Sequence, residues 1–379
     1  MKEIKEETYV NINEKPQKGF TTGSCSAAAA KAGAYMLLSG RNKENIKIET
    51  PAGIPYEAEL LDITRGQDYV SCAVRKYSGD DPDVTNGILI YVKVRLISDG
   101  LSRVEIKGGK GVGVVTRPGL DQKVGNAAIN SVPRKMMEKE VREIMDIFDC
   151  RDSLDLTVSV PEGERIAEKT FNPRLGIEGG ISIIGTTGIV EPMSIKAILD
   201  TIYVELRQLK EEGNEVAVIT PGNYGRQFLY SEYGYDIEGA VKCSNFVGDT
   251  VDMVRSLGFS KMLFAGHAGK LVKVSGGIMN THSKEADCRM ELLASAAARC
   301  GADTKIMNQI LDSFTTREAC EFIKEAGIIK QCFEYIAGRI KYYLTKRAEN
   351  EVQIECMIYM DEFGLLGKTP NAEMLLKMK

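Results

Sequence analysis

The stretch Glu215-Val-Ala-Val-Ile-Thr-Pro-Gly-Asn-Tyr-Gly225 decides the fold of the second half of the chain. A short apolar, β-branched run ends in a turn of proline, glycine and asparagine, and a helical pattern follows. The same order of strand, turn and helix recurs at Glu238–Cys243 and Lys261–Ala265, and we interpret Ile181–Ile184 with Gly185-Thr-Thr-Gly188 as a first copy. Such repeated units predict a parallel sheet covered by helices.

Helical patterns surround these strands. One runs from Met193 to Glu212, and after Glu285 leucine, alanine and methionine recur at spacings of three and four residues. A last strand-like run, Val352–Tyr359, precedes a short tail. We therefore expect residues 173–379 to form an α/β domain with a largely parallel sheet and a helical C-terminal part.

An alanine-rich helix opens the first half. The stretch Thr21-Thr-Gly-Ser-Cys-Ser-Ala-Ala-Ala-Ala30 places Ser24 and Ser26 just before the alanine run, and either side chain is suited to cap the helix. Gly40 is expected to end the helix shortly after Leu38.

The remaining segments of the first half predict a sheet and a second helix. Residues Ile46–Ile106 alternate between apolar and polar or carry β-branched runs between turn residues, which predicts an antiparallel sheet. A helical stretch, Pro133–Phe148, and a strand, Leu154–Val160, follow. We expect these parts to form an α+β domain over residues 1–172.

Composition and charge limit the classes of partner. The chain has 379 residues, which suggests two or three domains at about 150 residues each. Lys and Arg total 49 against 53 Asp and Glu, so the net charge is −4, and neither nucleic acid nor an anionic membrane is an expected partner. No apolar run approaches the roughly 18 residues of a membrane span, and Met1–Glu7 is charged, so we expect a cytoplasmic protein.

The cysteines predict neither disulfides nor a metal site. There are nine of them, an odd number, and no two have the C-x-x-C spacing. We therefore interpret them as reduced thiols and expect no metal bound by the protein itself.

The glycine-rich loop Lys107–Gly119 is a candidate anion site. It contains no acidic residue but carries Lys107, Lys110 and Arg117 among several glycines. Backbone amides and cationic side chains suit phosphate or carboxylate, whereas the alternative is a hairpin whose glycines adopt unusual φ angles. The loop does not match the Walker A pattern, and both interpretations stay open.

A second acid-free segment, Ser260–Lys284, begins at the carboxyl end of a predicted parallel strand. Open α/β sheets bind ligands at such ends. His267, Lys270 and Lys273 are three residues apart and would share one side of a helix. The alternative is a loop with solvated lysines and a buried histidine, but the place at a strand end favours function.

Polar residues after the other predicted strand ends complete a ring at one edge of the sheet. They are Gly185, Thr186, Thr187, Gly188, Asn223, Asn245 and Asp249. Threonine hydroxyls and helix N-terminal amides can bind an adenosyl or carboxylate group, although Asp249 could equally cap a helix.

The start of the alanine-rich helix is another terminus that favours anions. Thr22 and Ser24 lie there and are candidates for binding substrate. A helix start can also lower the pKa of Cys25, but we favour a packing role for this thiol over a nucleophilic one.

Several long strings carry a family resemblance. They include Gly19-Phe-Thr-Thr-Gly-Ser-Cys-Ser-Ala-Ala-Ala-Ala-Lys31, Gly108-Gly-Lys-Gly-Val-Gly113, Asn126-Ala-Ala-Ile-Asn-Ser-Val-Pro-Arg134, Phe171-Asn-Pro-Arg-Leu-Gly-Ile-Glu-Gly-Gly180 and Gly266-His-Ala-Gly-Lys-Leu-Val-Lys273. They resemble the cobalt-precorrin-5B C1-methyltransferase family, in order, from about residue 18 to 295.

The resemblance implies an activity and two domain types. The activity is transfer of a methyl group from S-adenosylmethionine to C1 of a cobalt corrinoid in anaerobic cobalamin biosynthesis, which gives cobalt-precorrin-6A. The first domain would be like the second domain of ribosomal protein S5, and the second would be Rossmann-like. Cobalt would arrive within the substrate, and other enzymes of cobalamin biosynthesis are candidate partners.

This substrate sets the expected roles of the candidate residues. A corrinoid precursor carries many carboxylates, so we expect dispersed cations to bind it. The candidates are Lys110, Arg117, Arg134, Arg174, Lys270 and Lys273, with Thr22 and Ser24. Methyl transfer depends on alignment, so we expect no nucleophile, with His267 as the candidate base and the strand-end ring as the S-adenosylmethionine site.

Two other functions stay open. One is a nucleotide-using kinase in which Lys107–Gly113 is the phosphate loop. The other is a corrinoid carrier without catalytic activity. Either would leave the Thr-Thr-Gly turn at 186–188 without a role.

Overall fold

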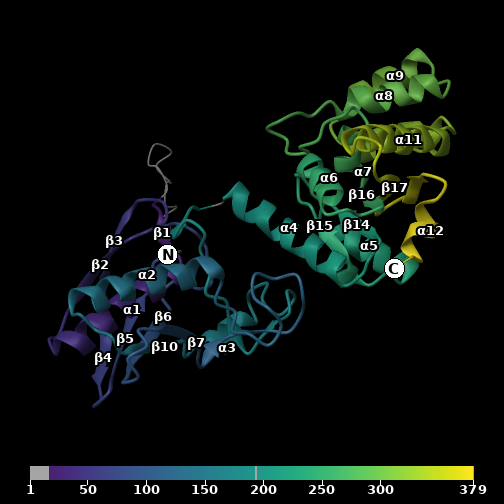
Figure 1. Ribbon diagram of the computed structural model, residues 1–379. Helices are drawn as coiled ribbons and strands as arrows, with labels where there is room; N and C mark the ends of the chain where they lie inside the picture. Colours follow the sequence, from purple (N-terminus) through teal and green to yellow (C-terminus); the bar gives the residue numbers. More distant parts are fainter. Residues whose placement is uncertain (1–16, 193, 379) are drawn as a thin grey trace, which may run out of the picture. The chain divides into compact units, whose positions relative to one another are not determined.

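The computed structural model describes residues 17–192 and 194–378 and divides the chain into two compact units, Met1–Ser194 and Ile195–Lys379 (Figure 1). The boundary lies at Ser194 rather than at residue 172, where the sequence analysis placed it. The reason is that the segments after residue 173 pair with strands of the first unit.

Helix α1, Thr22–Ser39, is the centre of the first unit. Its cap is Thr21, whose side chain accepts a hydrogen bond from the Ser24 amide. The expectation that Ser24 or Ser26 caps the helix was therefore wrong. Gly40 ends it at φ 70°, as predicted. The alanines at 27–30 are completely buried, because small side chains let the helix pack closely against the sheet and against α2, Ser131–Ile147.

The main sheet of the first unit has the order β4-β5-β6-β10-β7. All neighbours pair antiparallel except β10 and β7, which are parallel, so the expected antiparallel sheet is in fact mixed. The bounds are β4 Leu61–Arg65, β5 Tyr69–Arg75, β6 Leu89–Ile97, β7 Val104–Gly108 and β10 Ser153–Ser159. A separate hairpin joins β2, Asn45–Glu49, to β3, Pro55–Glu59, and the short helix α3, Gly163–Ala167, follows β10.

Three two-stranded pairings hold the segment after residue 173 to the first unit. They are β1 (Gly19–Phe20) with β13 (Ile189–Val190), β9 (Val114–Val115) with β11 (Ile177–Glu178), and β8 (Gly111–Val112) with β12 (Gly180–Ile181). Ile183 also bridges to Ile129. The interpretation of Ile181–Ile184 as the first strand of the parallel sheet was therefore wrong.

The second unit contains the expected largely parallel sheet, in the order β15-β14-β16-β17-β18. The first four strands are parallel and β18 is antiparallel. Their bounds are β14 Val216–Thr220, β15 Ala240–Lys242, β16 Lys261–His267, β17 Gln353–Met360 and β18 Gly364–Lys368. Because β14 comes first in the chain and lies between β15 and β16, the strand order reverses direction at β14.

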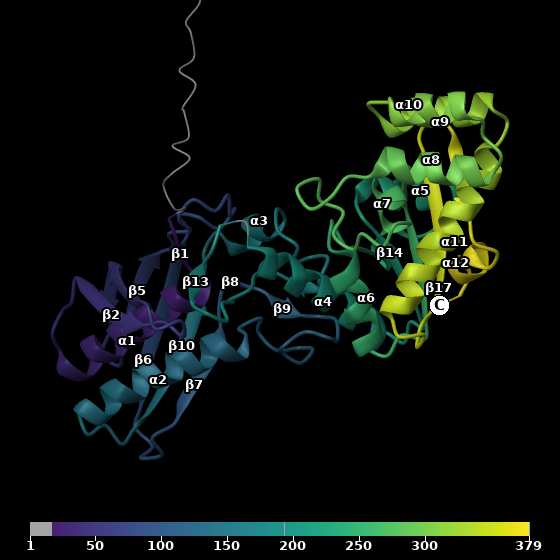
Figure 2. The ribbon, with the colours of Figure 1, turned by 90° about the horizontal axis from the view of Figure 1, so that it is seen from above.

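Both faces of this sheet are covered by helices (Figures 1 and 2). On one face Val218, Leu263 and Met357 pack with α5, Asn223–Tyr233, and α12, Ala372–Leu376. The alternate residues, such as Ile219 and Phe264, join the larger core of the opposite face. The helices that contribute to that core are α4 Ile195–Glu211, α6 Val247–Ser256, α7 Ala268–Val274, α8 Arg289–Arg299, α9 Thr304–Leu311, α10 Thr316–Glu325 and α11 Ile329–Arg347. A 3-10 turn, Ile237–Gly239, precedes β15.

None of the helices in residues 17–192 and 194–378 combines the length and the apolar character that a membrane crossing requires.

We predict that Gly185→Ala destabilises the first unit far more than Gly100→Ala. Both glycines have positive φ angles, +140° and +63°, but only at Gly185 would a Cβ atom clash, 2.2 Å from Oγ1 of Thr21. We expect Gly185→Ala to lower the free energy of unfolding by roughly 3 kcal/mol or more and Gly100→Ala by about 1 kcal/mol. Urea unfolding followed by circular dichroism measures both, and equal effects would contradict the role of this contact.

Candidate functional site

The carboxyl edge of the second unit's sheet is the first candidate site. β15, the strand that follows β14 in the chain, lies on one side of β14, and β16, the strand after that, lies on the other side. In open α/β sheets, ligands bind beyond the carboxyl ends of the strands where the order reverses in this way. The parallel sheet thus has a strand-order reversal at the edge predicted from the sequence, although its first strand is β14 and not Ile181–Ile184.

Three polar side chains end neighbouring strands at this edge: Thr220 on β14, His267 on β16 and Tyr359 on β17. His267 and Tyr359 are directly paired, with their ring centres 5.6 Å apart. The hydroxyls of Thr220 and Tyr359 are buried and have no hydrogen-bond partner within the described residues. Because buried hydroxyls are nearly always paired, these two orphans indicate a place for a polar ligand.

Tyr359 is held rigidly at this position. Its ring stacks on Phe228 of α5 with centres 4.3 Å apart and an angle of 6° between the planes. Burial raises the pKa of Tyr359, and the nearby Asp361 raises it further. The phenol therefore stays protonated and is able to donate a hydrogen bond.

The turn between β14 and α5 leaves the start of the helix open. Gly222 precedes α5 in an extended conformation, offers no capping side chain, and a Cβ atom there would meet nothing within 4 Å. Asn223 and Tyr224 are exposed in the first turn. Gly225 has a packing role, because a Cβ atom at this position would lie 2.9 Å from Cβ of Thr220.

His267 is the last residue of β16 and the cap of α7. Its Nδ1 accepts a hydrogen bond of 3.1 Å from the Gly269 amide, so the ring proton must be on Nε2. Burial lowers the pKa of His267, against the opposing effect of Asp361 and Glu362. A neutral ring with its proton on Nε2 suits a hydrogen-bond donor better than the general base that the sequence suggested.

Lys270 and Lys273 form hydrogen bonds with groups other than His267. Lys270 donates to Oδ1 of Asn245 over 3.0 Å, and burial lowers the pKa of Lys270. Lys273 is buried and donates to the backbone carbonyls of Thr281 and Ala286 over 3.3 and 2.9 Å. Its ammonium group thus holds a loop in place, and the structure gives no support to the prediction that Lys273 binds substrate.

Asn245 lies beyond the end of β15, as expected for a member of the predicted ring. Its Oδ1 also accepts a 3.3 Å hydrogen bond from Oγ1 of Thr281. Asp249 is exposed in the first turn of α6, where Phe246 occupies the cap position, so Asp249 does not cap the helix.

The Gly185–Gly188 turn belongs to the first unit and does not follow a strand of the parallel sheet. The Gly188 carbonyl accepts hydrogen bonds from Oγ of Ser24 and from the Thr21 amide, over 2.7 and 3.1 Å. Oγ1 of Thr22 accepts from the Ile184 amide over 2.8 Å. Thr22 and Ser24 are therefore buried anchors, and their contact with substrate stays a prediction. The place of 185–188 after a strand of the parallel sheet was wrong, because the preceding strand pairs with β8.

The glycine-rich loop is a close-packed connection. The amides of Gly109 and Gly113 donate to the carbonyls of Val158 and Ile181, and a Cβ atom at Gly111 would lie 1.8 Å from the Val160 carbonyl oxygen. The loop therefore needs its glycines for packing, and these amides do not form a phosphate cradle. Lys107 is an ion-pair partner of Asp155 on the neighbouring strand β10, with Nζ and Oδ2 2.8 Å apart.

The cationic side chains that were predicted to bind substrate in the first unit differ in their hydrogen bonds and in their exposure. Arg134 donates to the carbonyls of Ile129 and Ile106 over 2.8 and 2.9 Å, and burial lowers the pKa of Arg134, so it is a structural residue. Arg117 donates to the Arg174 carbonyl over 3.1 Å, and both side chains are partly exposed. Lys110 is exposed.

The thiol of Cys25 has a packing role, as favoured from the sequence. It is fully buried, and burial raises the pKa of Cys25 to about 11. Among the described residues, no group of three or more His, Cys, Asp and Glu side chains could hold a metal ion.

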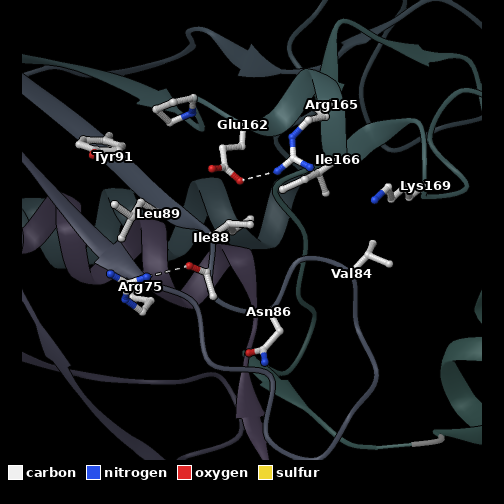
Figure 3. Close-up of a pocket in the computed structure, with 12 residues that line it drawn as sticks. Arg75, Val84, Asn86, Ile88, Leu89, Tyr91, Glu162, Arg165, Ile166 and Lys169 are labelled. Carbon is white, nitrogen blue, oxygen red and sulfur yellow. Dashed lines mark hydrogen bonds and ion pairs between the residues drawn. The ribbon is translucent and has the colours of Figure 1, made fainter.

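A second candidate site is a cavity of about 640 Å³ in the first unit, between α3 and the start of β6 (Figure 3). It is lined by apolar and cationic side chains together with Glu162 and Tyr91. The cations are Arg75, at the end of β5, and Arg165 and Lys169, in and just after α3.

Sequence reasoning missed the residues that carry both sites. Thr220 and Tyr359 are ordinary strand residues in sequence, and the only available signal was their place at the ends of predicted strands. Arg165 and Lys169 lie among glutamates in the chain, so a search for acid-free segments passed over them.

Comparisons with known proteins agree on one family over most of the chain. Residues 10–192 match the CbiD family, and residues 280–370 match the CbiD C-terminal domain. The cobalt-precorrin-5B C(1)-methyltransferase of Ruminiclostridium cellulolyticum is 44% identical over 94% of this chain and 92% of that protein. The proteins of the same name from Thermoanaerobacter sp. and Clostridioides difficile are 43% and 38% identical over 95% and 98% of this chain, and over 97% and 99% of their own lengths.

Among solved structures, the cobalamin biosynthesis protein CbiD from Archaeoglobus fulgidus is similar, at 27% identity over 73% of this chain and 84% of that one, with a TM-score of 0.38. The identity and coverage of the curated relatives show that the chain belongs to the CbiD family.

Proposed function

We propose that the chain transfers a methyl group from S-adenosylmethionine to C1 of cobalt-precorrin-5B, a step of anaerobic cobalamin biosynthesis that yields cobalt-precorrin-6A. The observation that carries this proposal is the 44% identity, over 94% of this chain, to a relative named for that reaction. Cobalt enters as part of the corrinoid substrate, and other enzymes of the pathway are candidate partners. We place the reaction in the cytoplasm, without nucleic acid or membrane.

The carboxyl edge of the second unit's sheet is our proposed S-adenosylmethionine site. The reversal of strand order at β14, the open start of α5 and the two orphaned hydroxyls support this assignment. Asn223, Asn245 and Asp249 remain proposed contacts, since amide and carboxylate groups suit the ribose hydroxyls and the amino acid part of the ligand. The strand order also supports the Rossmann-like description of this unit, and the likeness of the first unit to ribosomal protein S5 stays a prediction.

The chemistry asks for alignment rather than for a nucleophilic side chain. When bound, S-adenosylmethionine supplies an electrophilic methyl carbon, whose bond to sulfur breaks as the bond to C1 forms, with the electron pair left on sulfur. The residues of the site need to orient this carbon and exclude water. Rigid groups such as the stacked Tyr359 suit that task.

We propose that His267 positions the ligand through Nε2–H and does not act as a base. The Gly269 amide occupies Nδ1, and burial lowers the pKa of His267, so the neutral donor form is favoured. Of the cations expected to hold corrinoid carboxylates, Lys110, Arg117, Arg174 and Lys270 stay in the proposal.

The direct test of the function is incubation of the chain with cobalt-precorrin-5B and S-adenosylmethionine. We expect one S-adenosylhomocysteine to form for each methylated corrinoid, measured by mass spectrometry. A carrier would bind the corrinoid but form neither product, and this outcome would refute the proposal. A kinase would instead consume ATP.

We predict that Gly222→Val blocks S-adenosylmethionine binding without unfolding the chain. The extended backbone and the empty space around Gly222 accept a side chain, which would then stand at the open start of α5. Calorimetric titration should show binding weakened about tenfold or more, with thermal stability changed by no more than about 0.5 kcal/mol. Gly338→Val on α11, where a Cβ atom also meets nothing within 4 Å, is the matched control and should bind normally. Unchanged binding by Gly222→Val would place the site elsewhere.

We predict that His267→Asn lowers methyl transfer about tenfold, the value of one lost hydrogen bond. An asparagine side chain can still cap α7, so His267→Asn should keep the stability of the chain. His267→Ala removes the cap and should lower the free energy of unfolding by about 1 kcal/mol. Since the folded pKa of His267 is lowered, protons bind the unfolded chain more tightly, and wild-type stability should fall as pH drops below the ordinary value of 6.5. The asparagine variant should lack this part of the pH dependence.

Rates measured between pH 6 and 9 separate the donor from a base. If His267 is a hydrogen-bond donor, the His267→Asn variant should lose a similar factor in rate at every pH above about 6.5. A loss of about 100-fold or more, together with loss of the acidic limb of the pH–rate profile, would show that His267 is a base after all.

A further inference from the structure

We propose that the cavity between α3 and the start of β6 binds peripheral carboxylates of the corrinoid, with the apolar part of the macrocycle against its floor. The identity of the ligand rests on the proposed function, whereas the binding chemistry follows from the residues of the cavity. The residues that line this cavity do not include the glycine-rich loop.

The cavity has the size and the floor of a small-molecule site. Its volume of about 640 Å³ falls within the range of roughly 300–1,000 Å³ that is usual for such sites. Ile88 and Ile166 are buried beneath it, and Leu89 and Val84 add apolar surface, with Val84 47% exposed. An aliphatic floor of this kind suits the face of a large ring.

The cations stand around this floor on different sides. Figure 3 shows Arg165 and Lys169 on the side of α3 and Arg75 on the side of the strands, with Ile88 and Leu89 between them. Glu162 is the single acidic residue of the lining, so the cavity carries an excess of positive charge in a chain whose net charge is −4. Local charge of this sign favours an anionic ligand.

These cations are available to a ligand. The side-chain ammonium group of Lys169 has no hydrogen-bond or ion-pair partner within residues 17–192 and 194–378, and only its backbone amide is bonded, to the Ile166 carbonyl. Among the residues that the structure describes, Arg165 pairs only with Glu162, over 3.0 Å. Both side chains are more than 60% exposed, so the pair contributes little and is readily exchanged. Arg75 uses one guanidinium nitrogen to hold the Gly87 carbonyl at 3.2 Å, which fixes its place at the rim.

The arrangement favours several separate carboxylates over one phosphate group. Phosphate sites concentrate backbone amides and cations at one point, commonly at a helix start. Here α3 has five residues, Glu162 precedes it, and the cations are spread around an apolar surface. A corrinoid precursor matches this pattern, because its acetate and propionate chains surround an apolar ring.

The test measures corrinoid binding by the full chain without S-adenosylmethionine. The probe is cobyrinic acid, whose side chains end in free carboxylates, and the comparison ligand is cobinamide, in which the same ring carries amides. Affinity is followed by the change in corrin absorbance. The double variant Arg165→Gln/Lys169→Gln should bind cobyrinic acid about 100-fold more weakly than the wild type, about tenfold for each lost charged contact.

A matched double variant removes the same charges elsewhere in the first unit. Arg151 and Lys139 are exposed and, among the described residues, unpaired in their side chains, so Arg151→Gln/Lys139→Gln should change the affinity less than threefold, within the effect of net charge alone. Cobinamide should bind weakly to all three proteins. ATP is added as a competitor, and we expect it not to displace cobyrinic acid.

Four results would overturn the proposal: no binding of cobyrinic acid by the wild type, equal weakening in both double variants, cobinamide binding as tight as that of the acid, or displacement by ATP. Failure of the proposed function is a different result. A chain that binds cobyrinic acid through these cations but forms no S-adenosylhomocysteine with cobalt-precorrin-5B would confirm the cavity and refute the methyl transfer.

Discussion

The hydroxyl groups at the start of α1 are the contacts on which the organisation of the first unit depends. Thr22 and Ser24 bond to Ile184 and Gly188, between 162 and 164 positions later in the chain. Each buried hydrogen bond contributes about 1 kcal/mol, but leaving such a group unpaired costs more, so the contacts fix one arrangement of the chain. They draw the segment before Ser194 into the first unit, and that segment in turn covers the glycine-rich loop. These contacts explain how the conspicuous Thr-Thr-Gly turn is held in the first unit.

The elements that the sequence predicts well are those that local chemistry determines. The alanine run and Gly40 define α1, and alternating or β-branched runs define β5, β6, β14, β16 and β17. What the pattern does not contain is the partner of a strand. Ile181–Ile184 is a short apolar run before a glycine turn, and it looks the same whether it enters a parallel sheet or pairs with Gly111–Val112. The domain boundary was misplaced for the same reason.

The candidate sites were predictable to the same extent. Position at a strand end is visible in sequence, and the structure places His267 and the turn after Thr220 at the ends of parallel strands, as predicted. Whether a polar group is satisfied is not visible, because its partners come from distant segments. Lys273 looked like a free cation but is buried against two carbonyls. Thr220 ends a buried strand, yet its hydroxyl has no hydrogen-bond partner in the part of the chain that the structure describes. The protonation of His267 likewise depends on an amide that only the fold brings to Nδ1.

An acidic chain can bind a polyanionic substrate only if some of its cations remain available, and the fold decides which ones. Lys107 lies in an acid-free loop, yet β10 brings Asp155 to it across the sheet. Arg165 lies beside Glu162 in the chain, but their exposed pair is weak enough for a ligand carboxylate to replace. From the charges of neighbouring residues in the sequence, Lys107 is expected to be more available to a ligand than Arg165, but in the fold Arg165 is the more available of the two. Availability depends on burial and on cross-strand neighbours, and by that measure the cavity beside α3 is better equipped for carboxylates than the basic loop.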